Sequence, residues 1–427
     1  MKKTIRSVLT MFLAAFTLLG GAGCANPIEA RELTPPAAET NRDVSSLPQK
    51  PTDPFVAAMA DFSMTLSRTT LALEREDKAN HLISPLSAMV CLSMLANGAC
   101  GETLAQMEAV LGMPVDELNE FLYAYTKGLY VGEDCKVTLA DSIWYRDEEG
   151  RLTVKDEFLQ TCAEWYDAQQ YAAPFDEQTR KDINAWAKKY TDGMIDTMLD
   201  DPIPAAAVMY LVNALVFDAK WQAEYEKTQI ADRTFTAYDG TKTTVDMLHS
   251  EEGTYLEPAD GQGFAKPYKG GKYSFVGLLP DEGVDVYDFA AALDGEAWTS
   301  MWHGRMTATV HVRIPEFSYD SFMTLTPVLK EMGITDLFDS ELADLSGIGS
   351  SSQGNLFCSA VYQKTYIEVN RNGTKAAALT WGEVKDGAAA DPAEAKYVFL
   401  ERPFVYAIVD NATGLPLFVG VVTALSM

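Results

Sequence analysis

The stretch that decides the fold is GTKAAALTWGEVKDGAAADPAEAKYVFLERPFVYAIVD, residues 373–410. Its first half is rich in small residues, and its second half has the composition of a β-strand. A run of small residues this long between two predicted strands is too long for an ordinary connection. The question is whether it is a slack surface loop or a segment that can itself become a strand.

The alternation of side chains favours a segment that can become a strand, because successive residues of a strand face opposite sides. One side would carry only small or uncharged residues: Thr374, Ala376, Ala378, Thr380, Gly382 and Val384. The other side would carry all the charges and the Trp: Lys375, Ala377, Leu379, Trp381, Glu383 and Lys385. Residues 374–387 would span roughly 45 Å at about 3.3 Å per residue. The pattern predicts a loop that can insert into a sheet with its small face buried; an inert loop is the alternative.

Composition excludes several classes of protein. The chain has 427 residues, of which 47% are hydrophobic, so it can bury a large core and is not disordered. Its formal net charge is −27, which argues against nucleic acids and acidic membrane surfaces as partners.

The N-terminus, MKKTIRSVLTMFLAAFTLLGGAGCAN, combines a basic start with a short apolar run from Val8 to Leu19. This pattern predicts a secretory signal peptide over residues 1–23. Cys24 follows Gly-Ala-Gly and resembles a bacterial lipoprotein cleavage box, so we expect either a lipid on Cys24, holding the protein on the outer face of the membrane, or plain secretion. Residues 24–52 are rich in Pro, Ala, Glu, Ser and Thr and predict a disordered tether.

No motif for catalysis, metal binding or cofactor binding is visible in the sequence. Five cysteines follow Cys24 without CxxC spacing, which favours buried thiols over disulfides or a zinc site. The four histidines have no ligand spacing, and no GxSxG or phosphate-binding glycine motif occurs. We therefore expect a protein that is not an enzyme and needs no cofactor or metal.

Helical and strand patterns mix along residues 53–427 without an internal linker, which predicts one α+β domain. Helices are expected early, for example after Ser84 and Pro85, where a capping residue precedes proline. The run AAVMYLVNALVFDAKW, residues 206–221, predicts a strand buried on both faces. The run RPFVYAIVDNATGLPLFVGVV, residues 402–422, predicts a hairpin.

Several motifs in their order resemble the serpin family of serine protease inhibitors. They are NHLISPLSAMVCLSMLANGACGETLAQMEAVLG, LVNALVFDAKWQAEY, VHVRIPEFSY, VYQKTYIEVNRNGTKAAA and ERPFVYAIVDNATGLPLFVGVV. The resemblance spans residues 53–425, and together with the N-terminal sequence it predicts a bacterial secreted or lipid-anchored member. It implies a fold of three β-sheets and eight or nine helices, with an exposed reactive loop at about residues 373–402. In inhibitory serpins a protease cuts this loop, becomes acyl-linked to it, and is trapped when the loop inserts into the central sheet.

The resemblance also implies the site residues. Family spacing places the cleaved bond at Gly387–Ala388, within a range from Lys385 to Ala390. The small residues there favour an extracellular elastase-like serine protease, with a cysteine protease as another candidate partner of a monomeric inhibitor. The hinge that inserts first would comprise Gly373, Thr374, Lys375, Ala376, Ala377 and Ala378. Arg371 and Lys375 depart from the family pattern, since serpins usually carry Glu at both positions.

Four further residues match serpin positions where the central sheet opens: Ser84, Ser87, Asn213 and Gln363. Gln363 replaces a histidine that many serpins carry there, and an amide does not titrate as a histidine does. Trp221 matches an aromatic residue at the end of the sheet where insertion begins. The alternative function is a non-inhibitory serpin-fold binding protein whose loop is cleaved without trapping.

Overall fold

The computed structural model describes residues 28–35, 53–129, 132–147, 151–205, 207–352, 354–374 and 395–425. The predicted signal peptide, Cys24 and the predicted cleavage region, residues 385–390, lie outside the described residues. The hinge is described only for its first two residues, Gly373 and Thr374.

Nine α-helices lie in the described residues. They are α1 (Asp53–Glu74), α2 (Pro85–Ala96), α3 (Gly101–Leu111), α4 (Val115–Lys127), α5 (Asp156–Tyr166), α6 (Glu177–Tyr190), α7 (Val286–Ala292), α8 (Gly295–His303) and α9 (Thr326–Met332). Helix α2 begins as predicted, because the Ser84 side chain accepts a hydrogen bond from the Ser87 N–H and Pro85 occupies the first turn. Every residue of α2 is buried, so this helix lies in the centre of the molecule.

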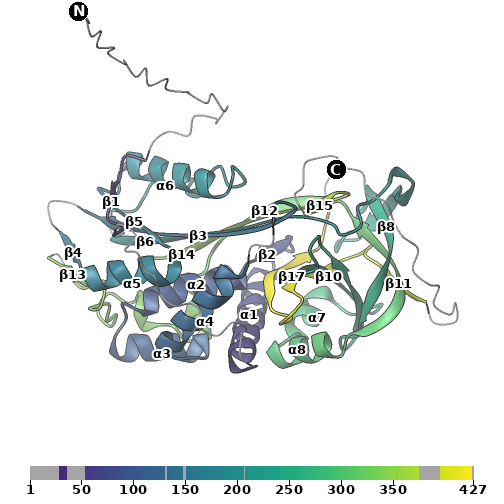
Figure 1. The fold of residues 1–427 in the computed structure, drawn as a ribbon, viewed down its shortest axis with the longest axis horizontal. Coiled ribbons are helices and arrows are strands. Elements are labelled where there is room, and N and C mark those ends of the chain that lie inside the picture. Colours follow the sequence, from purple (N-terminus) through teal and green to yellow (C-terminus); the bar gives the residue numbers. More distant parts are fainter. Residues whose placement is uncertain are drawn as a thin grey trace, which may run out of the picture.

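The central sheet has seven strands in the order β1, β5, β3, β6, β15, β14, β12. Their bounds are β1 (Arg31–Glu32), β5 (Gln169–Ala173), β3 (Cys135–Arg146), β6 (Met209–Lys220), β15 (Gly373–Thr374), β14 (Val361–Asn370) and β12 (Phe317–Thr324). Helices α2 and α5 lie beneath this sheet and α6 lies on its opposite face (Figure 1). A small core that includes Trp144, Trp186 and Tyr210 packs under α6, so β6 is buried on both faces as its apolar sequence predicts.

A second sheet has nine strands and lies beyond the end of the first (Figure 1). Its path is β16 (Lys396–Phe399), β11 (Met306–Pro315), β8 (Lys242–Leu256), β9 (Gly261–Pro267), β10 (Tyr273–Pro280), β17 (Phe404–Asp410), β18 (Pro416–Val422) and β2 (His81–Ile83), with β7 (Ile230–Thr236) paired to β8. Strands β17 and β18 form the predicted hairpin. Strands β4 (Leu152–Val154) and β13 (Gly349–Ser351) make a third, two-stranded sheet.

This architecture confirms the predicted α+β fold with three sheets and eight or nine helices. Four of the five cysteines after Cys24 are buried thiols as expected, and Cys100 is half-buried.

Two boundaries differ from the sequence prediction. Residues 28–35, expected in the tether, instead add β1 to the edge of the central sheet, where the Asp182 carboxylate accepts hydrogen bonds from the Glu29 and Ala30 N–H groups at 3.1 and 2.8 Å. A polar segment can dock in this way because a sheet edge offers unpaired backbone groups. The loop is also shorter than residues 373–402, since its expected ends form β15 and β16.

Candidate functional site: the division of the central sheet

The two middle strands of the central sheet, β6 and β14, are in direct contact along only part of their length. They pair in parallel at one end, where Val361, Tyr362 and Gln363 lie opposite Leu211, Val212 and Asn213. Farther along, no described strand lies between residues 364–368 of β14 and residues 214–218 of β6. The strands therefore diverge from a closed end to an open end.

The open end already holds the first two residues of the loop. Strand β15 lies between β14 and β6 and is antiparallel to both, with Thr374 opposite Val369 on one side and Ala219 on the other. At Gly373, a Cβ atom would lie 2.0 Å from the Ala219 carbonyl oxygen, so only glycine fits between these backbones. Thr374 is 2% exposed, which matches its predicted place on the buried face.

Aromatic residues pack against this short strand. The Thr374 hydroxyl lies 2.6 Å from the Tyr268 hydroxyl, and burial raises the pKa of Tyr268 well above its usual value. Trp221 stacks on Tyr268 with ring centroids 4.6 Å apart, and its indole N–H donates to the Asn370 carbonyl at 2.8 Å. The Trp221 backbone N–H donates to the Asn372 carbonyl at 3.0 Å. The structure thus brings Trp221, a predicted site residue, into contact with both ends of the turn that precedes the loop.

A buried ion pair lies against the ring of Trp221. The Lys266 ammonium lies 2.8 Å from a Glu252 carboxylate oxygen, and these side chains are only 2% and 7% exposed. The ammonium also lies 5.3 Å from the centre of the Trp221 ring and 4.5 Å from that of Tyr225, within the range of cation–π attraction. The Ser250 hydroxyl donates to the same Glu252 oxygen at 2.6 Å. Sequence reasoning missed this pair, because the two residues lie on different strands and neither stands in a motif.

Arg371 fixes the turn between β14 and β15. Its guanidinium Nε and Nη2 donate to the two oxygens of Glu316 at 2.9 and 2.7 Å, and Nη2 also donates to Asp246 at 2.8 Å. The hydrogen bonds that Arg371 donates to Glu316 are the main reason that the Arg371 pKa is raised. Arg371, which departs from the family pattern, is therefore paired with two carboxylates, Asp246 on β8 and Glu316 between β11 and β12.

A second polar group lies under the closed end of the sheet, and it includes Ser84, Ser87 and Gln363. The Gln363 amide makes two hydrogen bonds to the backbone of Ser84, accepting from its N–H and donating to its carbonyl, both at 2.9 Å. The Ser84 hydroxyl donates to the Leu417 carbonyl at 2.9 Å, and Ser87 donates its backbone N–H to that hydroxyl at 3.3 Å. Ser84 therefore both caps α2 and contacts Gln363.

Asn213 lies opposite Gln363 in the sheet, and its side chain bonds to the neighbouring strand β3. Its amide N–H donates to the Asp141 carboxylate on β3 at 2.5 Å. Burial raises the pKa of Asp141 to about 7, although the hydrogen bond from Asn213 lowers it. Sequence reasoning missed Asp141, and the ADSIWYRD strand gives no signal for it beyond a lone acid in an apolar run.

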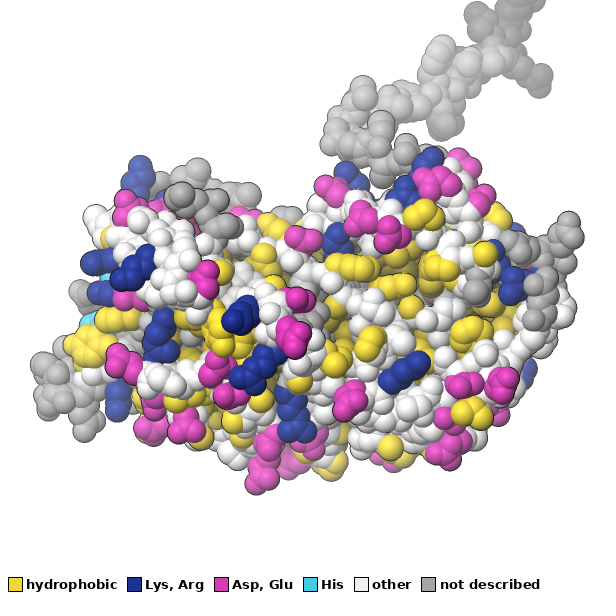
Figure 2. All heavy atoms as spheres, turned by 180° about the vertical axis from the view of Figure 1, so that it is seen from behind, with side chains coloured by type: hydrophobic (Ala, Val, Ile, Leu, Met, Phe, Trp, Pro, Cys, Tyr) yellow, Lys and Arg dark blue, Asp and Glu magenta, His cyan; other side chains and the backbone are white. Residues whose placement is uncertain are grey.

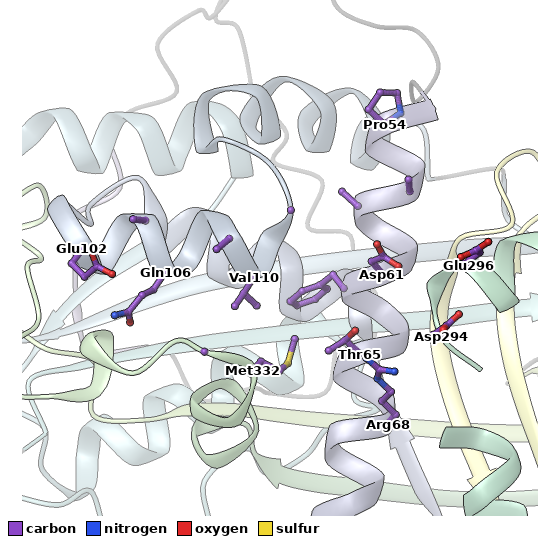
Figure 3. A pocket seen from close by; sticks show the side chains of 17 residues that line it. Pro54, Asp61, Thr65, Arg68, Glu102, Gln106, Val110, Asp294, Glu296 and Met332 are labelled. Carbon is purple, nitrogen blue, oxygen red and sulfur yellow. The ribbon is translucent and has the colours of Figure 1, made fainter. Parts of the chain in front are cut away.

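No group of three or more His, Cys, Asp or Glu side chains among the described residues could hold a metal ion. A hollow of about 940 Å³ lies between α1, α3, α8 and α9, where Asp61, Asp294 and Glu296 surround one end near Arg68 (Figure 3). The described residues that line it include no histidine, cysteine or serine.

Two further observations concern surfaces. No helix in the described part of the chain is long and apolar enough to cross a membrane. On the face drawn in Figure 2, Lys and Arg side chains of described residues are scattered among acidic ones and do not gather into one basic patch. This distribution agrees with the acidic composition.

The family model for "Serpin (serine protease inhibitor)" matches residues 57–425. The chain belongs to the serpin family. Members of this family are typically protease inhibitors rather than catalytic enzymes.

The serpin is similar to several characterised chains. One is the thermophilic serpin tengpin, whose crystal structure in the native state matches with a TM-score of 0.83. The two sequences are 41% identical, and the match covers 88% of this chain and 95% of that one. Iripin-8 of Ixodes ricinus is 28% identical over 83% of this chain and 90% of its own length. Serpin B11 of Homo sapiens is 29% identical over 80% of this chain and 92% of its own length.

Proposed function

We propose that this serpin is a suicide-substrate inhibitor of extracellular serine proteases, and that an elastase-like enzyme is its target. The observation that carries the proposal is strand β15, which already lies between β6 and β14 with Gly373 and Thr374 buried. A loop whose first residues are paired on both sides in the intact protein has a defined route into the sheet.

The register of β15 gives the length of that route. Thr374 lies opposite Val369 and Ala219, so each later loop residue would lie one position earlier along both neighbours. Residues 375–379 would then lie between residues 364–368 and 214–218, where no described strand lies now. Thr380 would arrive opposite Gln363 and Asn213, so insertion beyond residue 379 requires β6 and β14 to part at their closed end.

Cleavage would supply the free end that insertion needs. The serine hydroxyl of the protease would attack the carbonyl carbon at Gly387, forming an ester, and the new amino group of Ala388 would leave with a proton. Insertion of residues 375–387 would then carry the ester-linked protease along the sheet before water hydrolyses the ester. The small residues around the bond, GAAA at 387–390, suit a shallow specificity pocket. Lys385 and Asp386 are the alternative cleavage positions for trypsin-like and Asp-specific enzymes.

The N-terminal sequence supports a location for this activity. We propose that the protein is a bacterial serpin exported by residues 1–23 and anchored by a lipid on Cys24 at the outer face of the cell membrane. The link between the lipid and the folded body would then be only residues 25–27, because Arg31 and Glu32 pair with the central sheet. Incorporation of labelled fatty acid into the wild-type chain but not into a Cys24→Ala variant would support the anchor. Label in neither chain would leave plain secretion.

Trapping is tested by mixing the chain from Ala25 onward with pancreatic or neutrophil elastase and analysing the products by denaturing gel and mass spectrometry. We expect a covalent band near the summed mass and a released peptide that begins at or near Ala388. The matched control is Thr374→Arg. This substitution leaves the sequence around the cleaved bond unchanged but puts a long charged side chain at a position that is 2% exposed. This variant should be cut at the same bond without a covalent product.

Clean cleavage of the wild-type loop without a covalent product, across a panel of serine and cysteine proteases, would overturn the inhibitor proposal. It would favour the alternative, a non-inhibitory serpin whose loop is a substrate. A covalent band equally strong for wild type and Thr374→Arg would show that trapping does not use insertion at β15.

A further inference from the structure

Asp141 and Asn213 form an isolated polar pair inside the central sheet. They lie directly opposite each other on β3 and β6, and their residues are 2% and 3% exposed. The Asn213 amide N–H donates to Oδ1 of Asp141 at 2.5 Å. Among the described residues nothing donates to the amide oxygen of Asn213, although that oxygen is buried. A buried acceptor without a hydrogen-bond donor lowers the stability of the fold, so a donor to this oxygen is expected.

Within the described residues, no positive charge compensates the Asp141 carboxylate. No salt bridge from a described residue reaches it, and the titratable groups that face it are neutral or acidic. From α2 the neighbour is the Cys91 thiol, from α5 they are the Cys162 thiol and the Tyr166 hydroxyl, and just beyond α5 it is the Asp167 carboxylate. An ionised carboxylate in these surroundings would have the one Asn213 hydrogen bond and an acidic neighbour, which favours the protonated acid.

We propose that Asp141 is protonated in the intact serpin and forms a reciprocal acid–amide pair with Asn213, so that one proton fastens β3 to β6 and makes the sheet sensitive to pH. The Asn213 N–H donates to one carboxyl oxygen, and the proton on the other carboxyl oxygen is donated to the Asn213 amide oxygen. Both buried polar groups are then satisfied without a charge. Loss of the proton leaves a buried charge and returns the amide oxygen to its unpaired state.

The location makes this pair relevant to the sheet as a whole. Asn213 is also the partner of Gln363 across the β6–β14 junction, so Asp141, Asn213 and Gln363 form one row over three adjacent strands. Gln363 is an amide and does not titrate. In this row Asp141 is therefore the residue that responds to pH.

The direction of the pH effect follows from linkage. The pKa of Asp141 in the folded protein is about 7, above the ordinary value of 3.8 that applies in the unfolded chain. The folded state therefore holds a proton that the unfolded state releases, and the stability from this proton is complete below pH 4. It is lost as the pH rises from about 4 to 7, at up to about tenfold in the unfolding equilibrium constant per pH unit, and it changes little above that range.

The test compares wild type with Asp141→Asn in the chain from Ala25 onward, uncleaved, by denaturant unfolding between pH 5.5 and 8.5. An asparagine can make the same two hydrogen bonds at every pH. We expect the stability of the variant relative to wild type to rise by about ten- to thirtyfold in the unfolding equilibrium constant as the pH increases across this range. Asp320→Asn, on strand β12 of the same sheet and exposed, is the matched control and should leave the pH profile unchanged.

Parallel pH profiles of wild type and Asp141→Asn would overturn the proposal. If the variant does not fold, infrared spectroscopy of the wild type labelled at aspartate provides a second measurement. A protonated carboxyl band that persists at pH 6 and disappears near pH 7 supports the proposal, and the absence of such a band at pH 6 refutes it. Both measurements use uncleaved protein, so their outcome does not depend on whether the serpin traps a protease.

Discussion

Removing the charge of Lys266 should destabilise the end of the sheet where the loop enters. Lys266 and Glu252 are almost completely buried and lie 2.8 Å apart. In Lys266→Met, Glu252 keeps only the Ser250 hydroxyl as a described donor, and its charge stays inside the protein. Breaking a buried pair from one side costs about 3–5 kcal/mol, because the remaining charge is uncompensated. The loss of the cation–π contacts with Trp221 and Tyr225 adds to this cost.

The double variant Lys266→Met/Glu252→Gln separates the charge effect from packing. Because it leaves no buried charge, we expect it to recover more than about 2 kcal/mol of the loss, a clear coupling in a double-mutant cycle. The matched control is the more exposed pair of Lys220 and Asp134, 2.7 Å apart, whose side chains are 16% and 50% exposed. Lys220→Met should cost no more than about 1 kcal/mol, because water screens the pair.

The assay is denaturant unfolding of the uncleaved chain, followed by tryptophan fluorescence, with the free energy of unfolding extrapolated to water. A loss of less than about 1 kcal/mol for Lys266→Met, or a double variant no more stable than the single one, would refute the reasoning. Either result would mean that water or a rearranged side chain compensates Glu252.

The other predictions concern the hinge, its turn and the N-terminal strand. Gly373→Val should expel β15 and turn the serpin into a substrate, seen as cleavage without a covalent product, whereas Gly253→Ala has open space at its Cβ and should keep trapping intact. Arg371→Glu puts a third carboxylate beside two others and should lower the unfolding midpoint more than Arg371→Ala does, and equal midpoints would contradict this. Asp182→Ala removes the acceptor of two backbone N–H groups and should speed proteolysis within residues 28–35, whose rate in wild type is the reference.

Much of the fold could be predicted from local patterns in the sequence. Ser84 followed by Pro85 indicated where α2 begins, and the apolar run of β6 indicated a strand covered on both faces. These predictions hold because a helix cap and a strand's burial depend on neighbours within a few residues. The alternation after Gly373 likewise predicted that Thr374 faces inward, and it is buried.

The partners of polar side chains were decided by the tertiary structure alone. Arg371 finds Glu316 and Asp246, which are 55 and 125 residues away in the chain, and Asn213 finds Asp141 at a separation of 72 residues. Nothing in the local pattern of an acid or an amide says which strand will lie beside it. That choice follows from sheet order and register, which are set by burying the whole core. The sequence by itself therefore determined the strands and the alternation of the segment after Gly373, while the packing of the sheets determined which polar side chains meet.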